Sequence, residues 1–392
     1  MDNLKQKALE LHEEIQGKIS TELKTELNNK EQLSLVYSPG VAEPCKKIHE
    51  NEINAYKYTG KANTIAVISN GTAVLGLGNI GATAALPVME GKACLFKKFG
   101  GLNAVPLVID TEDTDEIIKF VKQVSPTFGG INLEDISAPK CIEIEKRLKE
   151  ELNIPVFHDD QHGTAIVTIA ALINSLKLVK KEPKNCNVVI SGVGAAGSSI
   201  IKMLNNFGIN DIFAFNSKGI LIEGNEYNNK LYEELARETN KERKSYSLEE
   251  AMQNSDIFIG VSVPDKINKD MVSSMRRDPI ILAMANPDPE IPYDEAKEAG
   301  AKVVGTGRSD FPNQVNNVLA FPGLFKGALS VHANKITENM KVAAAYAIAS
   351  LIDDDDIRED YVIPSPFDMR VADVVAESVA KCAVEEGVST GY

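Results

Sequence analysis

The sequence predicts an α/β protein with two main domains, and three observations lead to this fold class. The chain has 392 residues, enough for two large or three small domains at about 150 residues each. From residue 64 onward, short apolar segments alternate with helical stretches. Gly192, Gly194 and Gly197 stand between an apolar segment and a helical stretch, the arrangement of a dinucleotide-binding turn.

The first predicted element is an amphipathic helix. Apolar residues recur every three or four positions from Leu4 to Leu27, with Asn3 as a candidate N-cap. We expect this helix to dock on the body of the protein or on a partner subunit. Residues 1–165 then form an N-terminal α/β catalytic domain, whose expected strands are TIAVIS, AVLGLG, VPLVID and IPVFHD.

The second predicted domain is a doubly wound, Rossmann-type domain over residues 166–325. Residues 164–179 indicate a buried helix, and the Pro-containing segment KKEPKN follows it, so we place the domain boundary there. Residues 326–392 indicate helices that return to the first domain or cover its flank. The five expected strands of the second domain are NVVISG, DIFAFN, DIFIGVS, IILAMAN and KVVGTG.

Composition excludes several classes of protein. The 42 basic and 56 acidic residues give a net charge of −14, which disfavours nucleic acid and anionic membranes as partners. No stretch reaches the ~18 uninterrupted apolar residues of a spanning helix, and the N-terminus has no apolar segment behind a basic start as in a signal peptide. Five widely spaced cysteines without a C-x-x-C pair indicate reduced thiols and a cytoplasmic protein: Cys45, Cys94, Cys141, Cys186 and Cys382.

Two glycine fingerprints compete for the coenzyme. One contains Gly192, and the other, GLGNIG, begins at Gly76 with the same spacing. We favour the first, because Pro87 is expected to interrupt the helix that follows GLGNIG. The strand after the favoured turn ends at Asn216, where NAD-specific sites usually have an acidic residue. Since Asn216 does not repel a 2′-phosphate and Lys218 could attract one, NAD, NADP or both remain open.

Four acids indicate a metal site. Glu134 and Asp135 lie in NLEDIS, and Asp159 and Asp160 lie in VFHDDQHGT, each pair near an expected strand end. Gathered carboxylates repel one another unless a cation lies among them, and hard oxygen ligands suit Mg²⁺ or Mn²⁺. The alternative is that these acids cap helices or lie in solvated loops. A zinc site at His158 and His162 is disfavoured, because these residues are not expected to share a helical face.

Lys92 and Tyr37 are candidate proton-transfer residues. Lys92 lies in the apolar segment PVMEGKACLFKKFGG, where burial and a neighbouring cation would lower its pKa and make the amine a general base. The alternatives are that its ammonium group reaches solvent or forms an ion pair. Tyr37 precedes a Pro-Gly turn that could project the phenol into a cleft, and the alternative is an ordinary core tyrosine.

Seven segments in order give the chain a resemblance to the malic enzyme family, in its short bacterial form without a phosphotransacetylase-like domain. The resemblance implies oxidative decarboxylation of L-malate to pyruvate and CO₂ with reduction of NAD or NADP, dependent on Mg²⁺ or Mn²⁺. It covers about residues 30 to 385. The segments are YSPGVAEPC, GTAVLGLGNIGATAALPVMEGKACLFKKFGG, LEDI, VFHDDQHGTA, ISGVGAAG, MANPDPE and NQVNNVLAFPG.

The resemblance also implies residue roles. Lys92 would be the general base, Tyr37 the acid that protonates C3 of the enol, and Asp159 the residue that orients the lysine. The metal ligands would be Glu134, Asp135 and Asp160. The coenzyme would bind at Gly192, Val193, Gly194, Ala195, Ala196, Gly197, Asn216, Ser217, Lys218 and Asn286.

Substrate contacts are implied for Lys92, Asn286, Asn317 and the neighbouring Asn316; the alternative for these amides is strand-end capping. Larger relatives have an arginine for the substrate carboxylate where this chain has Ala73, so another group must supply that charge.

Two other functions stay open from the sequence. One is a metal-independent amino-acid dehydrogenase, which would use the same dinucleotide turn and a catalytic lysine. The other is a dinucleotide-binding sensor without catalytic activity. In each case we expect a small-molecule ligand, and the amphipathic first helix favours a homodimer.

Overall fold

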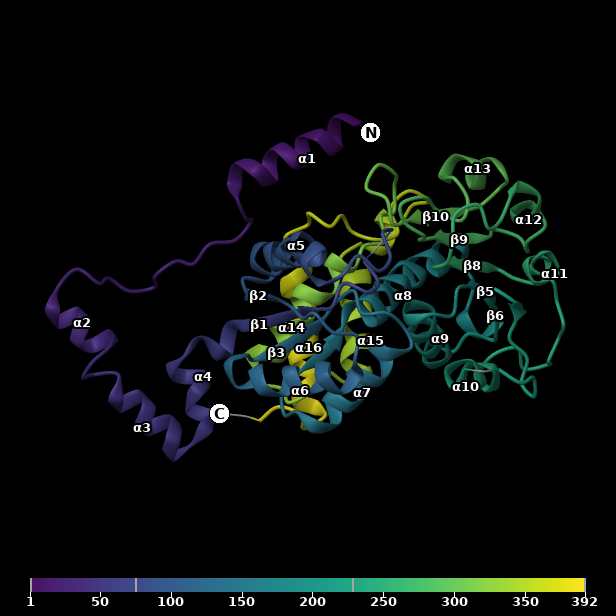
Figure 1. Cartoon of the computed structure of the whole chain (residues 1–392). Helices are drawn as coiled ribbons and strands as arrows, with labels where there is room; N and C mark the ends of the chain where they lie inside the picture. Colours follow the sequence, from purple (N-terminus) through teal and green to yellow (C-terminus); the bar gives the residue numbers. More distant parts are fainter. Residues whose placement is uncertain (1, 75, 228, 391–392) are drawn as a thin grey trace.

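The computed structural model describes residues 2–74, 76–227 and 229–390, and contains two sheets and an N-terminal arm that extends away from them (Figure 1). The expected helix to Leu27 is wrong beyond Ile15, because Gln16 and Gly17 adopt φ angles of +50° and +115° and end it. The arm consists of α1 (Asp2–Ile15), α2 (Lys30–Val36), α3 (Ala42–Glu50), α4 (Ala55–Tyr58) and the 3₁₀ turns η1 (Glu52–Asn54) and η2 (Gly60–Asn63).

The first sheet is parallel, with strand order β2-β1-β3-β4. Its elements are β1 (Thr64–Ser69), α5 (Ala82–Gly100), β2 (Asn103–Val108), α6 (Thr114–Val124), η3 (Ser125–Thr127), β3 (Gly130–Leu133), α7 (Lys140–Glu151) and β4 (Val156–His158). Successive side chains of β1 point to opposite faces of the sheet. Ile65 and Val67 join a core cluster with residues of α5, whereas Ala66 and Ile68 join one with residues of α6 and α7.

Two expectations for the first domain are wrong. The described residues of AVLGLG, 73–74 and 76–78, do not form the expected strand: the Val74 amide donates to the Gly78 carbonyl at 3.0 Å, and Gly76 and Gly78 have positive φ angles. Pro87 does not interrupt the next helix, because α5 runs through it. The proline lies only six residues into α5, so the hydrogen bond that it removes is close to the helix start.

Helix α8 (Asp159–Val179) joins the two sheets. It confirms the buried helix expected over residues 164–179 and begins earlier, directly after β4. By length and composition α8 could cross a bilayer, but 78% of its apolar window is buried inside the fold. Its residues contribute to one core cluster that also holds residues of β1 and of the second sheet. This helix therefore fixes the first sheet against the second.

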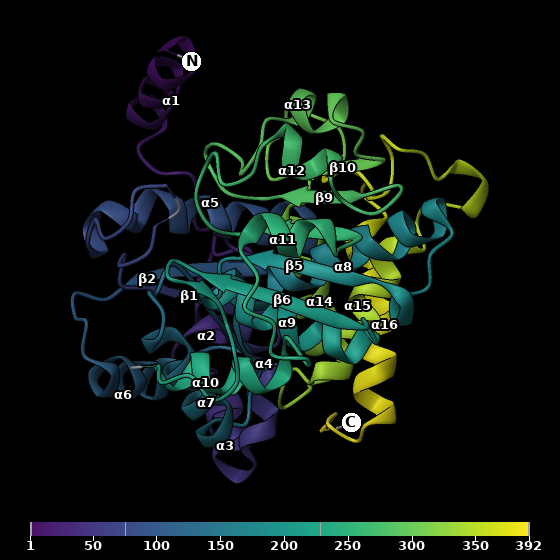
Figure 2. The same ribbon diagram turned by 90° about the vertical axis from the view of Figure 1, so that its right-hand side faces the viewer.

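The second sheet has strand order β10-β9-β8-β5-β6-β7, and confirms the five expected parallel strands (Figure 2). The sheet also contains β7, which the sequence did not predict; it is a short antiparallel strand at the edge of the sheet. Val188 of β5 belongs to the core cluster shared with α8, whereas Val189 faces a second cluster. The bounds are η4 (Pro183–Asn185), β5 (Asn187–Ser191), α9 (Ala195–Phe207), β6 (Asp211–Asn216), β7 (Gly219–Ile220), α10 (Lys230–Glu238), α11 (Leu248–Gln253), β8 (Ile257–Gly260), α12 (Lys269–Ser273), β9 (Ile280–Ala283), α13 (Tyr293–Glu298) and β10 (Val303–Thr306).

The C-terminal helices pack against one another and against both α5 and α8. The backbones of α14 and α16 approach each other closely at Gly327, which has no side chain. An added Cβ there would lie 2.4 Å from the carbonyl oxygen of Ala376. In Figure 2 these helices lie beside α8, behind the strands of the second sheet. Their bounds are η5 (Asn317–Leu319), α14 (Phe321–Ser330), α15 (Glu338–Ala349), η6 (Asp354–Asp356) and α16 (Val371–Glu385).

Candidate active site

The four candidate acids meet at the carboxyl edge of the first sheet. Glu134 and Asp135 directly follow β3, and Asp159 and Asp160 follow β4 and form the first turn of α8. Because β3 and β4 are parallel neighbours, their ends place the two pairs side by side. The amide of Asp135 donates to the carboxylate of Asp160 at 2.9 Å.

Lys92 reaches this cluster from α5. Its ammonium group lies 3.0 Å from Glu134 and donates a short hydrogen bond to Asp159, and the lysine side chain is 7% exposed. Asn317 donates to the same carboxylate of Asp159. The ring of Phe321 lies 4.0 Å from Nζ, so a cation–π contact also supports the charged amine. The amine is therefore held by two carboxylates and an aromatic ring rather than reaching solvent.

Glu134, Asp135 and Asp160 form a set of oxygen ligands. One carboxylate oxygen from each lies within 4.8 Å of the others. Among the described residues, Oδ2 of Asp135 is buried without a hydrogen-bond partner. A buried carboxylate oxygen without a donor is costly, and a hard divalent cation satisfies such oxygens. The residues present therefore fit Mg²⁺ or Mn²⁺.

The pKa values of the acids reflect this crowding. Burial, together with the charges of Asp160 and Glu134, raises the pKa of Asp135 to about 8. Burial also raises the pKa of Asp159 to about 8, against the opposing charge of Lys92. The pKa values of Glu134 and Asp160 are raised as well, again mainly by burial.

The expected lowering of the Lys92 pKa is wrong for the ion-free protein. Burial alone would lower this pKa, but the charges of Asp159 and Glu134 outweigh burial and raise it. The neighbours of Lys92 are acids rather than the second cation that the sequence interpretation required. A deprotonated amine therefore requires that the charge of these acids be balanced by something else.

The dinucleotide turn lies between β5 and α9, at the carboxyl edge of the second sheet. Gly194 caps α9, and among the described residues no atom beyond its chain neighbours and the local helix backbone lies within 4 Å of the position a Cβ would take there. At Gly197 an added Cβ would lie 1.9 Å from the Gly192 carbonyl oxygen, so the helix and the turn pack directly together. Val193 is buried, and Ala195 and Ala196 begin α9. Backbone amides at this helix start can receive a pyrophosphate.

The candidate ribose contacts lie at the end of β6. Asn216, Ser217 and Lys218 line a cavity of about 530 Å³ together with Tyr227 and Asn229. The Asn216 side chain accepts from the Lys218 amide at 2.7 Å, which holds the turn but leaves its amide nitrogen for a ligand. The last residue of β6 is Asn216 rather than an acidic residue. The structure therefore does not decide between NAD and NADP.

The three candidate asparagine residues lie in different surroundings. Asn317 joins the Lys92 cluster through Asp159. Asn316 accepts from the Val318 amide at 3.0 Å and caps η5, which is the capping alternative. Asn286 is exposed after β9, and its carbonyl oxygen lies 3.7 Å from the position of a Cβ on Gly76. The loop with Asn286 therefore faces the GLGNIG turn of the first sheet.

The structure does not bring Tyr37 to this cluster within one chain. Tyr37 ends α2 on the arm, and its side chain is 69% exposed. It is not a core tyrosine. Ala73, where larger relatives have an arginine, lies beside the acids, since its amide donates to the Asp135 carbonyl at 3.0 Å.

Sequence reasoning missed two residues that position the sites. The Asn132 side chain donates to Glu134 at 2.8 Å. Its amide group within a fully buried strand was the signal that could have identified it in the sequence. Glu290 is fully buried and accepts from the amides of Ser262 at 2.8 Å and Ala285 at 3.0 Å, thereby holding the loops after β8 and β9. Its segment MANPDPE was noted only for Asn286.

Comparisons with known proteins agree with this geometry. Residues 16–149 match the family model "Malic enzyme, N-terminal domain", and residues 161–384 match "Malic enzyme, NAD binding domain". The chain is 58% identical over 388 residues to the bifunctional malic/malolactic enzyme of Bacillus subtilis, covering 99% of this chain and 95% of that one. It is 52% identical to the NAD-dependent malic enzyme of Geobacillus stearothermophilus, covering 96% and 78% of the two chains.

Two solved structures have the same fold. The malic enzyme of Pyrococcus horikoshii superposes with a TM-score of 0.94 at 43% identity, covering 99% of this chain and 92% of that one. The NAD-dependent malic enzyme of Thermotoga maritima superposes with a TM-score of 0.92 at 49% identity, covering 95% and 98%.

Proposed function

The chain belongs to the malic enzyme family, and on this premise we propose that it oxidises L-malate and decarboxylates the product, giving pyruvate and CO₂ with reduction of NAD or NADP. The reaction depends on Mg²⁺ or Mn²⁺. The observation that supports this function most directly is the cluster in which a buried lysine contacts two carboxylates beside a three-acid ligand set.

The ligand set assigned to the cation is Glu134, Asp135 and Asp160. These three residues would hold a divalent ion, which would balance their charge and supply Lewis-acid polarisation of a substrate oxygen. The chain's own contribution is to hold the three oxygens within 4.8 Å, with Glu134 and Asp135 buried and Asp160 partly exposed.

Lys92 is the general base for the C2 hydroxyl proton. Asp159 and Asn317 orient its amine, because Asp159 accepts hydrogen bonds from both side chains. The ammonium form is favoured while the acids carry uncompensated charge, so the amine becomes a base only when that charge is balanced. The Lys92 amine and the Asn317 amide are both placed to contact the substrate through hydrogen bonds.

The acid for C3 is assigned to Tyr37 of a second copy of the chain, in a homodimer. Tyr37 is 69% exposed on an arm that leaves the body, so it needs another surface to act on (Figure 1). The arm also exposes apolar side chains, among them Leu4 at 73% and Leu35 at 70%. Apolar surface of this extent usually marks a protein interface. A cytoplasmic location, expected from the five unpaired cysteines, is part of this proposal.

Initial rates test the function. We expect reduction of NAD or NADP with malate and Mn²⁺, and loss of that rate on complete chelation. Lys92→Ala should lower turnover by about 10³-fold while coenzyme binding persists. Malate oxidation that survives chelation would support the amino-acid dehydrogenase type of site, and full activity in Lys92→Ala would support the sensor. Because the Bacillus relative is named malic/malolactic, lactate should be measured beside pyruvate.

A further inference from the structure

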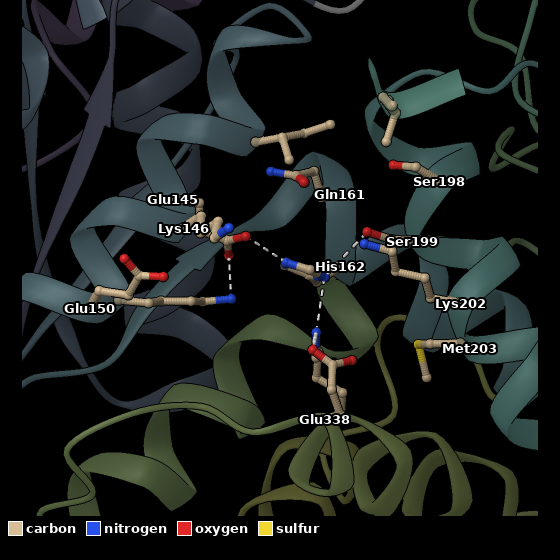
Figure 3. Close-up of a pocket in the computed structure, with 14 residues that line it drawn as sticks. Glu145, Lys146, Glu150, Gln161, His162, Ser198, Ser199, Lys202, Met203 and Glu338 are labelled. Carbon is tan, nitrogen blue, oxygen red and sulfur yellow. Dashed lines mark hydrogen bonds and ion pairs between the residues drawn. The ribbon is translucent and has the colours of Figure 1, made fainter. Parts of the chain in front are cut away.

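A second cavity lies between α7, α8, α9 and α15, at the boundary of the two sheets (Figure 3). Its volume is about 320 Å³, enough for a small ligand. None of the residues that line it belongs to the Lys92 cluster, to the glycine turn or to the cavity at Asn216. It is therefore separate from the assigned substrate and coenzyme positions.

The lining has an excess of positive charge after its internal ion pairs are formed. Glu145 pairs with Lys149 at 2.8 Å, and Glu338 pairs with Lys341 at 2.5 Å. Among the described residues, three further charged side chains of the lining form no ion pair. These are Lys146, Lys202 and Glu150. Two unpaired lysines against one glutamate favour an anion.

Gln161 is a buried residue of the lining whose amide nitrogen has no partner in the described part of the chain. The residue is 3% exposed, and among the described residues its Nε2 has no hydrogen-bond acceptor. Figure 3 shows Gln161 and Ser198 on neighbouring walls of the cavity. Leaving a buried donor unsatisfied is costly, and a ligand oxygen would satisfy it.

The wall opposite Gln161 is held by a hydrogen-bond network centred on His162. Its Nε2 lies 2.8 Å from Glu145, and its Nδ1 lies 3.1 Å from the Lys341 ammonium group. Since an ammonium group only donates, Nδ1 is the acceptor and Nε2 carries the proton toward Glu145. The network links α7, α8 and α15 on one side of the cavity.

We propose that this cavity binds a small anion with a carboxylate or phosphate group and regulates the enzyme. Gln161 directly follows Asp160 of the ligand set, and Ser198 directly follows Gly197 of the dinucleotide turn. An anion held between them contacts the starts of both α8 and α9, and thereby biases the relative position of the two sites. The regulatory role rests on the proposed function, whereas the binding does not.

Calorimetry tests the binding with succinate and, separately, with inorganic phosphate, on the full chain with Mg²⁺ and NAD. We expect Lys146→Gln/Lys202→Gln to weaken binding at least about tenfold. Lys146→Arg/Lys202→Arg keeps the charge and should keep binding, and so should the control Lys119→Gln/Lys335→Gln, which changes exposed lysines elsewhere. Lys92→Ala should also keep it, because that variant changes only the catalytic cluster. The probe that binds identifies the carboxylate or the phosphate source.

Three results would overturn the proposal: no binding of either probe, equal binding in the wild type and the Gln pair, or binding that disappears in Lys92→Ala. Kinetics then test the regulation. The effective probe should change the KM for malate or coenzyme severalfold in the wild type, and this change should be absent in the Gln pair. An unchanged KM at saturating probe would overturn regulation. Failure of malate turnover itself would contradict the proposed function instead, with the calorimetric result still standing.

Discussion

At the residue scale, the behaviour of Lys92 is set by its neighbours more than by its burial. A buried lysine alone would have a lowered pKa, but Asp159 and Glu134 raise it. The assigned metal ligands surround the same group, so metal occupancy and the protonation of the base are linked.

The raised pKa of Asp135, about 8, predicts a pH-dependent metal affinity. Below pH 8 a cation must displace a proton from this carboxyl group, so the apparent Kd for Mn²⁺ should fall about tenfold per pH unit for each displaced proton between pH 6 and 8. Metal titrations at several pH values measure this slope. Asp135→Asn should weaken binding and flatten the slope, and a pH-independent Kd in the wild type would contradict the assignment.

The same shifts predict the stability of the metal-free protein. The folded pKa values of Asp135 and Asp159, about 8, lie above the unfolded value of 3.8. Their contribution to stability is therefore complete below about pH 4 and is lost as the pH rises through 8. We expect Mn²⁺ to raise Tm more at pH 8 than at pH 6. Thermal unfolding with and without Mn²⁺ checks this. An equal rise in Tm at both pH values would contradict the raised pKa values of Asp135 and Asp159.

Asn216 predicts how coenzyme choice can be changed. An acidic residue there would accept from ribose hydroxyls and repel a 2′-phosphate, so Asn216→Asp should raise the KM for NADP at least about tenfold relative to that for NAD. Lys218→Ala should act in the same direction if its ammonium group contacts the phosphate. Rates with both coenzymes measure the ratio, with malate KM as the control. An unchanged ratio of the two KM values in both variants would mean that the 2′-phosphate of NADP does not bind near Asn216 and Lys218.

At the element scale, each site depends on where parallel strands end. The register of β3 with β4 brings two acid pairs together, and the β5 turn opens α9 with free backbone amides. Both are consequences of parallel sheets, whose carboxyl ends share an edge.

Gly194 and Gly197 predict two different effects of an added methyl group. At Gly197 a Cβ would lie 1.9 Å from a backbone oxygen, so Gly197→Ala should destabilise the second domain and lower Tm by several degrees. At Gly194 the position is open, so Gly194→Ala should keep Tm but weaken coenzyme binding by obstructing the pyrophosphate. Calorimetry and coenzyme titration separate the two. Similar effects of both substitutions would refute this distinction.

At the scale of the whole molecule, the extended arm separates Tyr37 from Lys92 within one chain. The proposed dimer reunites them across subunits, and this arrangement makes a quantitative prediction. When Tyr37→Phe and Lys92→Ala subunits are mixed and allowed to exchange, each heterodimer has one site with both residues intact. Equal mixing should restore about a quarter of the wild-type activity.

Each variant alone is the control and should stay inactive in pyruvate formation. Mixing without recovery, when subunit exchange is verified by mass, would mean that both residues act in the same chain. Sedimentation of the wild type should show a dimer, and a monomer with full activity would contradict the assignment.

The sequence alone determined the alternating α/β pattern, the five strands around the dinucleotide turn and the acids near strand ends, because these depend on local periodicity and on residue chemistry. Three predictions from the sequence were wrong: the helix continuing past Gln16, the interruption at Pro87 and the strand at AVLGLG. At these places backbone geometry and contacts with neighbouring residues outweigh the local sequence pattern. Only the tertiary structure decided that Asp159 and Glu134 surround Lys92, that Tyr37 lies outside the cluster, and that Gln161 lines a second cavity. Contacts between residues far apart in the chain, and the electrostatic fields that they create, exist only once the two sheets and α8 are packed together.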